Sequence, residues 1–274
     1  MTIGVEMAFM VAGARLTFTI GFLALVVPTV AQDMMRYIDV NSPEMTSAEM
    51  TRAQVEAALA GAKSGTPADF TGKKLSGLDL SGLDLSHAVF RAAKLNRTNL
   101  SGTKLDGAIL DQAWLLDADL SNASLKGANI FAAQMQRAKL DGAELSGARI
   151  ASDLTGASLA GASLAYANLS ADMKNQSMGL MRAVLKSAKL ERANLRGTNL
   201  ARADLEFASL KGADLTGASL VSADLGGADL TGANIADADL AGADLNATKL
   251  IAPVGLDAAK NLDKAQNLQR AVRQ

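Results

Sequence analysis

Large apolar residues recur at every fifth position along most of this 274-residue chain. The pattern begins at Phe70, Leu75 and Leu80 and ends at Leu250, with leucine at most of the central positions. A helix repeats its apolar face with a period of 3.6 residues, and a strand does so with a period of two. A period of five fits neither element, so the pattern predicts a repeat architecture.

Small and polar residues occupy the other positions of each five-residue unit. Alanine usually stands two residues before the central leucine, Asp or Asn often stands between them, and glycine recurs two residues after it, as at Gly77 and Gly217. Residues two apart in an extended segment point to the same side, so the alanine and the leucine share one face. Gly, Ser, Asp and Asn favour the turn that comes next. The unit therefore predicts a coiled chain whose interior is filled by alternating small and large side chains.

Segments 213–217 and 228–232 both read ADLTG, and this unit resembles the motif of the pentapeptide repeat family. The resemblance covers about residues 68–250 and implies an all-β fold, a right-handed quadrilateral β-solenoid with four units per coil. Nearly nine coils would form a rod roughly 40 Å long at the usual spacing between strands. Leu78 and Leu83 replace the alanine of the motif, so the first coil is expected to widen where a helix docks.

The two ends of the chain are predicted to differ from the repeat. Residues 32–67 are interpreted as a linker followed by a capping helix over about 46–62, because Thr46 and Glu49 have the spacing of a capping box. Residues 253–274 place leucine and alanine three residues apart, which predicts a helical C-terminal cap. The alternative is that one open end of the stack pairs with a second copy and forms a homodimer.

The solenoid predicted for residues 68–252 contains an interruption at residues 170–182. The central positions Leu169 and Leu185 are sixteen residues apart, and the segment between them is polar and rich in methionine. A smaller break, where the step shortens to four residues, comes after Ile150. We predict a loop that projects from one corner, and loops on rigid scaffolds often carry function. The alternative is a tolerated insertion without a role.

An uncharged apolar run from Leu16 to Ala31 comes after Arg15 near the N-terminus. A basic residue, an apolar run and small residues in this order are typical of a signal peptide, so residues 1–31 are predicted to direct export, with cleavage after Ala31. The protein is then periplasmic or secreted. The run is shorter than the roughly 20 residues of a membrane span. An uncleaved leader that anchors the protein in a membrane is one alternative, and a buried helix of a cytosolic protein is another.

Residues that usually carry catalysis or bind metals are scarce. The chain has no cysteine and a single histidine, His87. This composition excludes a cysteine nucleophile and a multi-histidine metal site, and it argues against a histidine-based triad. The glycines follow the five-residue period and form no phosphate-binding motif. We therefore predict no catalytic residue, no cofactor and no metal site, and a protein that is not an enzyme.

The charges are nearly balanced, with 27 basic and 28 acidic residues and a net charge of −1. General nucleic-acid binders carry a basic excess, so no nucleic-acid partner is expected. Asp204, Asp224 and Asp244 are twenty residues apart and would stack in one column of a four-unit coil. A divalent cation would relieve their mutual repulsion. Hydrogen bonds from these short side chains to local backbone are the favoured interpretation.

Candidate contacts with a protein partner come from outward-facing aromatic residues and from the interruption. They are Trp114, Phe131, Tyr166, Lys174, Met178 and Arg182. Basic residues over 182–202 and acidic residues over 204–244 form bands that would steer a partner. The favoured function is a non-catalytic, exported β-solenoid scaffold for an unidentified protein partner. The alternative resembles the quinolone-resistance members of the family, a cytosolic DNA mimic that binds a type II topoisomerase.

Overall fold

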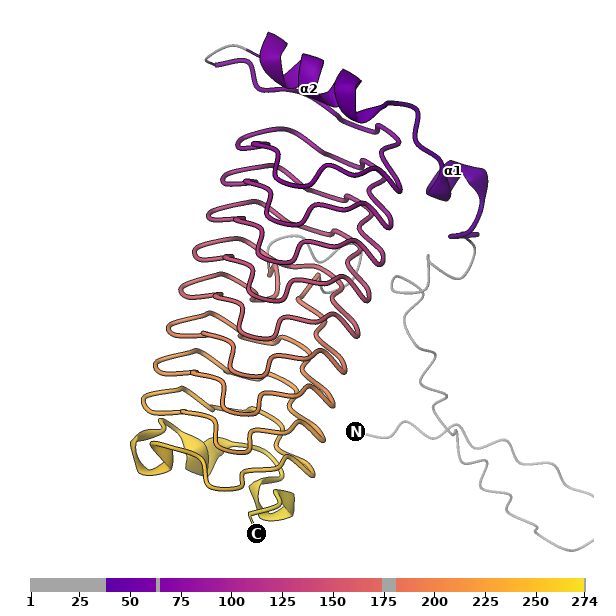
Figure 1. Cartoon of the computed structure of the whole chain (residues 1–274). Coiled ribbons are helices and arrows are strands. Elements are labelled where there is room, and N and C mark those ends of the chain that lie inside the picture. Colours follow the sequence, from indigo (N-terminus) through magenta and orange to yellow (C-terminus); the bar gives the residue numbers. More distant parts are fainter. Residues whose placement is uncertain (1–37, 63–64, 174–180, 274) are drawn as a thin grey trace, which may run out of the picture.

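The fold is a stack of similar coils, with a helix across its first end and short helical turns at its last (Figure 1). A computed structural model describes residues 38–62, 65–173 and 181–273. The predicted leader at residues 1–31 lies outside these ranges, and so do the candidate contacts Lys174 and Met178. No helix within the described ranges is long and apolar enough to cross a membrane.

Parallel backbone bridges join each coil to the next. Lys74 pairs with Lys94 and Lys94 pairs with Trp114, so equivalent residues are twenty apart and each coil contains four units. The amide of Leu95 donates to the carbonyl of Trp114 at 2.7 Å, and the amide of Trp114 donates to the carbonyl of Ala93 at 2.9 Å. Over the described ranges this pairing consists of isolated bridges, one per unit, rather than long strands. The repeat therefore forms a solenoid-like stack in which every unit is tied to the coils on both sides.

The core is a continuous column of leucine and alanine inside the coils. Leu215 and Ala213, for example, are completely buried. Phe70 and Phe90 stack at the first end of the column, with their ring centroids 5.1 Å apart. The side chains fill the interior, so the stability of the stack rests on apolar burial repeated at every unit.

The corners need a backbone conformation with positive φ. Gly77 takes φ 73° there, and Asn122 occupies an equivalent corner with φ 57°. Glycine adopts this left-handed region without the penalty that a Cβ brings, and asparagine tolerates it better than most residues. This geometry explains why glycine recurs two residues after the central leucine.

Two walls of the stack carry its main irregularities, and each wall is defined by a column of paired residues. Wall 1 carries the column Val89, Ile109, Asn129, Arg149 and Asn168, and wall 2 carries Lys74, Lys94, Trp114, Gln134 and Asp153. Both breaks in the repeat lie at the corner between these walls. One coil is shortened there, because Gln134 pairs with Asp153 only nineteen residues later. The next coil contains the insertion, because Asp153 pairs with Val184.

The N-terminal helix is shorter than predicted. Helix α1 spans Pro43–Thr46, and helix α2 spans Arg52–Gly61. The chain cannot be helical between them, because Ala48 pairs with Leu75 and the amide of Glu49 donates to the Lys74 carbonyl. The capping box is accordingly formed by Thr51 and Gln54 instead of Thr46 and Glu49.

Helix α2 closes the first end of the stack. Val55 on α2 is completely buried against the core, and the Arg52 guanidinium donates to the carbonyls of Asp79 and Ser81. Leu78 and Leu83, which replace alanine in the first coil, are partly buried and pack against the same core cluster as residues of α2.

The predicted helical cap at residues 253–274 takes a different form. The chain makes three short 3-10 helices there, η3 Leu256–Ala258, η4 Leu262–Lys264 and η5 Leu268–Arg270. The bridging residues in this segment are six apart, and they pair with the coil above as Asn234–Val254, Asp239–Lys260, Asp244–Gln266 and Lys249–Val272. The three-residue spacing of leucine and alanine is thus half of a six-residue unit. Each unit has one residue more than in the main repeat, and its corner forms a 3-10 turn. The stack continues through this last coil instead of ending at residue 252.

Candidate functional site

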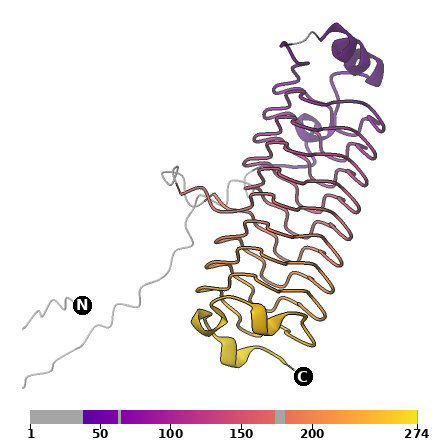
Figure 2. The same cartoon turned by 90° about the vertical axis from the view of Figure 1, so that its left-hand side faces the viewer.

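The base of the interrupting loop is the most distinctive feature of the side walls. The described ends of the insertion, residues 170–173 and 181–182, leave the side of the stack in Figure 2. Its two ends meet where the amide of Asp172 donates to the carbonyl of Met181 at 2.7 Å. The insertion and the shortened coil share one corner, so the loop base lies beside the shortened coil.

Ion pairs fasten the loop base to the coils on both sides. The Arg149 guanidinium lies 3.2 Å from an Asp172 carboxylate oxygen, and the Arg182 guanidinium lies 2.8 Å from the Asp204 carboxylate. The Asp204 side chain is only 3% exposed, so this pair is largely protected from solvent screening. Lys186 lies 3.6 Å from the same carboxylate. Salt bridges therefore hold both described ends of the insertion to the neighbouring coils.

Phe131 extends this base along wall 1. The centre of the Arg149 guanidinium lies 4.4 Å from the centroid of the half-buried Phe131 ring. This geometry is that of a cation–π contact. A chain of contacts thus runs from Phe131 through Arg149 to Asp172 at the neck of the loop. The next residue in the sequence, Met173, is 49% exposed. Two of the predicted contact residues, Phe131 and Arg182, lie at the same corner of the stack but in different coils.

The other predicted aromatic residues do not join this surface. Trp114 is half-buried on wall 2, between Lys94 and Gln134 in its column. Tyr166 is 73% exposed at a different corner, where its ring lies against the backbone of Gly197 in the next coil. The predicted patch of Trp114, Phe131 and Tyr166 is therefore split over separate parts of the surface.

Sequence reasoning overlooked Phe207. This side chain is 63% exposed and lies against Gly227 in the same way that Tyr166 lies against Gly197. Its position two residues after a central leucine marks it as a corner residue in the sequence. Arg149 and Asp172 were also overlooked, because they are 23 residues apart and no local pattern indicates their pairing.

The aspartate column forms as predicted from the twenty-residue spacing. Asp204 bridges to Asp224, and Asp224 bridges to Asp244. Each carboxylate accepts a hydrogen bond from the backbone amide two residues later, namely those of Glu206, Gly226 and Asn246. Within the described ranges no group of three or more metal-binding side chains is placed to hold a cation. The column thus has the local hydrogen bonding that was the favoured interpretation.

Wall 1 also holds a carboxyl group in an unfavourable setting. Burial raises the pKa of Asp111, with Arg91 and Arg149 acting in the opposite direction. One Asp111 oxygen is buried without a hydrogen-bond partner among the described residues.

Comparison with known proteins identifies the repeat. The family model described as pentapeptide repeats matches eight copies, over residues 74–112, 115–147, 180–217 and 208–246. No curated protein matches the chain.

Several solved structures are similar to the chain. HetL, a pentapeptide repeat protein involved in heterocyst differentiation regulation from the cyanobacterium Nostoc sp. strain PCC 7120, is 28% identical, with 82% of this chain and 95% of HetL covered and a TM-score of 0.48. Rfr23 from the cyanobacterium Cyanothece 51142 is 24% identical over 44% of this chain and 91% of its own, with a TM-score of 0.32. Full-length QnrB1, a plasmid-mediated fluoroquinolone resistance protein, is 19% identical over 74% of this chain and 85% of its own, with a TM-score of 0.30.

Proposed function

Because the chain belongs to the pentapeptide repeat family, we propose that it is a non-catalytic scaffold whose side walls bind a protein partner. The finer form of the fold that the motif implies, a right-handed quadrilateral β-solenoid, is part of this proposal. Family membership by itself does not supply a partner, because function lives in sites added to a fold.

The loop base is the observation that carries the proposal. Leucine and alanine fill the interior of the coils, so the chemistry of the protein lies on its outer walls. At the loop base the pairs Arg149–Asp172 and Arg182–Asp204 hold the neck of the loop to two coils. A pre-organised surface loses little conformational freedom on binding. An exposed Met173 and a half-buried Phe131 supply apolar contact area beside these charges.

Site-specific crosslinking in the native host tests this function. A photoreactive amino acid replaces Met173 at the loop base, and a matched variant carries it at the exposed corner residue Asn122. We expect one protein adduct from position 173 and none from position 122, with the partner identified by mass spectrometry. Equal labelling from both positions, or labelling from neither, would contradict a partner at the loop base.

Export is the second part of the proposal. We propose that the protein is periplasmic or secreted after cleavage at Ala31, with membrane anchoring by an uncleaved leader as the alternative. Mass spectrometry of the N-terminus in each cell fraction distinguishes these states. A chain that begins near Gln32 outside the cytoplasm is expected. A cytosolic chain that keeps its leader would contradict export and favour a DNA mimic that binds a type II topoisomerase.

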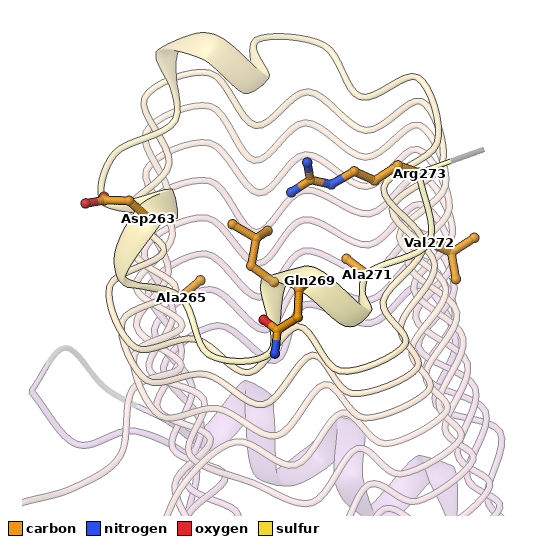
Figure 3. A pocket seen from close by; sticks show the side chains of 7 residues that line it. Asp263, Ala265, Gln269, Ala271, Val272 and Arg273 are labelled. Carbon is orange, nitrogen blue, oxygen red and sulfur yellow. The ribbon is translucent and has the colours of Figure 1, made fainter.

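The last coil is proposed to pair with a second copy. Leu262 and Leu268 are half-buried there, whereas Leu245 in the preceding coil is completely buried. Figure 3 shows a depression at this end, lined in part by Ala265, Gln269 and Ala271. Helix α2 covers the other end, so head-to-tail association is blocked and only two like ends can meet. Such an isologous contact closes as a dimer.

A further inference from the structure

A short N-terminal segment lies against wall 2 of the first three coils. We call residues 39–49 the strap, and Figure 1 shows its helix α1 beside the stack. The outward-facing residues Ser76, Asn96 and Leu116 on this wall are only 4%, 4% and 5% exposed. The equivalent residue of the next coil, Gln136, is half-buried. The additional burial over the first three coils coincides with the strap.

The strap places one apolar side chain and its backbone on the wall. Met45 is buried, and its carbonyl accepts a hydrogen bond from the Asn96 amide nitrogen at 3.0 Å. The Asn96 amide oxygen accepts from the backbone amide of Leu116 at 3.0 Å. Asn96 therefore joins the strap to the wall, and the buried Leu116 lies one coil further along. We call this stretch of wall the groove. It donates a hydrogen bond to the backbone of the helical turn α1 and covers the apolar Met45 side chain of that turn.

Two lysines of the groove hold one carboxylate of the strap. The Glu44 carboxylate contacts the Lys94 ammonium at 2.6 Å and also pairs with Lys74. Hydrogen bonds from these lysines lower the pKa of Glu44 to about 2. Lys74 and Lys94 are bridged neighbours in one column, so the wall itself sets their spacing. The groove thus selects a carboxylate directly followed by an apolar residue.

Further contacts hold the two ends of the strap. At its last residues Ala48 bridges Leu75, and Lys73 pairs with Glu49 at 3.2 Å. Arg97 donates to the Asn41 side chain at 3.0 Å, and the amide of Glu49 donates to the Lys74 carbonyl at 2.9 Å. The Glu44 side chain is largely exposed, and exposed ion pairs are weak and screened by salt. Because its ion pairs are exposed, the strap is expected to open locally more readily than the core coils. On the wall beneath the strap, the Ser76 hydroxyl is buried without a hydrogen-bond partner among the described residues. The strap therefore leaves one polar group of the groove without a hydrogen bond.

The groove also extends beyond the strap. A depression of about 150 Å³ adjoins the N-terminal part of the strap, and its lining comprises Val40, Asn41, Asn96, Arg97, Leu116, Asp117 and Arg137. Arg137 and Asp117 form a two-point ion pair there, with distances of 2.8 and 2.7 Å. A segment longer than the strap would find a further polar site along the same wall.

We propose that wall 2 of the first three coils is a peptide-docking groove for a carboxylate followed by an apolar residue, and that the strap occupies this groove until a partner segment of that chemistry replaces it. The inference rests on the proposed function as a protein-binding scaffold. The inference adds the chemistry of the partner segment, and it identifies the strap as a segment of the same chain that competes with the partner for the groove.

Peptide exchange on the purified full chain tests the groove. The probe is a fluorescein-labelled peptide with the sequence of residues 38–50, followed by fluorescence anisotropy. Glu44→Lys places a cation against Lys74 and Lys94 and should release the strap, so this variant is expected to bind the probe at least tenfold more tightly than the unmodified chain. A probe that carries the same Glu44→Lys change should not bind. The matched control Glu191→Lys, far from the groove, should behave as the unmodified chain.

A second variant and a structural measurement keep the test decisive. Met45→Ser removes the buried side chain without changing charge and should produce the same gain in probe binding. Hydrogen exchange reports whether the strap is released while coils around Leu215 stay protected. The proposal is overturned if the strap stays protected in both variants, or if it is released and the probe binds no more tightly. In either case an intact crosslink at position 173 would leave the proposed scaffold function standing.

Discussion

At the scale of single residues, the central and corner positions of a unit have different physical roles. The central leucine is buried on every side by its own coil and by the coils above and below, as Leu215 illustrates. The corner residue is exposed and contributes through its backbone conformation. Substitutions at the two positions should therefore act by different mechanisms and to different extents.

Leu215→Ala should destabilise the stack strongly. Removal of a fully buried leucine side chain leaves a cavity and typically costs about 2–5 kcal/mol. Val221→Ala is the control, because Val221 is half-buried on an outer wall. Its change should stay near about 0.5 kcal/mol. Chemical denaturation of both variants measures the difference, and equal losses would mean that the core column does not carry the stability.

Gly197→Ala and Gly217→Ala form a matched pair at one type of corner. Both glycines have positive φ, 62° and 66°, so both changes should cost on the order of 1 kcal/mol. Only at Gly197 would the new Cβ meet the Tyr166 ring, at 2.7 Å. We expect a larger fall in the unfolding midpoint for Gly197→Ala, and Tyr166→Ala in the same chain should remove the excess. A difference that survives Tyr166→Ala would rule out the ring as its cause.

At the scale of elements, the strap and the loop base show how tertiary contacts govern segments with weak intrinsic structure. The strap contains only the four-residue helix α1, which is far too short to be stable alone. The loop base depends on charges that come from neighbouring coils. The behaviour of each segment should therefore follow its ion pairs.

Docking of the strap should depend on pH at the acid end. The pKa of Glu44 is lowered from 4.5 to about 2 by Lys74 and Lys94, so the docked form binds fewer protons than the released form in this range. The stabilisation is complete above pH 4.5 and is lost as the pH falls through about 2. Trp114 follows Lys94 in the same column and is the single tryptophan of the chain, so its fluorescence can follow the release. Glu44→Gln should lack this transition, and an unchanged acid profile in that variant would contradict the assignment.

The pair Arg182–Asp204 should be coupled. Arg182→Ala leaves the nearly buried Asp204 carboxylate with Lys186 as its remaining cation, and loss of a partner from a buried charge costs roughly 1–3 kcal/mol. Asp204→Asn alone should also destabilise. The double variant should lose less stability than the sum of the losses in the two single variants, because the second change removes the charge that the first left unpaired. Strict additivity in denaturation experiments would show that the pair does not hold the loop base.

At the scale of the whole molecule, the two ends of the stack are unequal. Helix α2 buries Val55 against the first coil, whereas the last coil leaves Leu256, Leu262 and Leu268 half-buried. Exposed apolar surface joined to an open backbone edge favours association. Under the proposed end-to-end pairing, this asymmetry would restrict association to pairs of like ends.

Leu268→Glu should convert a dimer into a monomer. The substitution places a charge on the open end, while Phe207→Glu adds the same charge at an exposed corner on the side of the stack. Light scattering after size-exclusion chromatography measures the mass of each variant. We expect the monomer mass only for Leu268→Glu, and a monomeric unmodified chain at all concentrations would contradict end-to-end pairing.

The sequence alone was sufficient to predict the repeat and much of its geometry. The period of five, the twenty-residue column of Asp204, Asp224 and Asp244, and the place of the insertion all arise from local patterns. Each unit makes the same contacts as its neighbours, so a pattern within five residues already contains the information that defines a coil. The position of the loop could be read for the same reason, because an insertion shifts the register.

Other features depended on contacts between distant segments. Thr51 and Gln54 provide a local signal for the start of helix α2 at Arg52, but no local signal reveals that Ala48 pairs with Leu75 and thereby excludes Thr46 as the cap. The pairing of Arg149 with Asp172 likewise joins two residues that are 23 positions apart, across neighbouring coils.

The sequence by itself determined the repeat, its filled core and the family to which the chain belongs, since these arise from interactions that every unit repeats. Only the tertiary structure decided that residues 254–272 form a further coil, that the strap covers wall 2, and that Trp114, Phe131 and Tyr166 lie apart. These features occur once in the chain and join residues far apart in sequence. Their free energy depends on which surfaces meet, and a five-residue period contains no information about that.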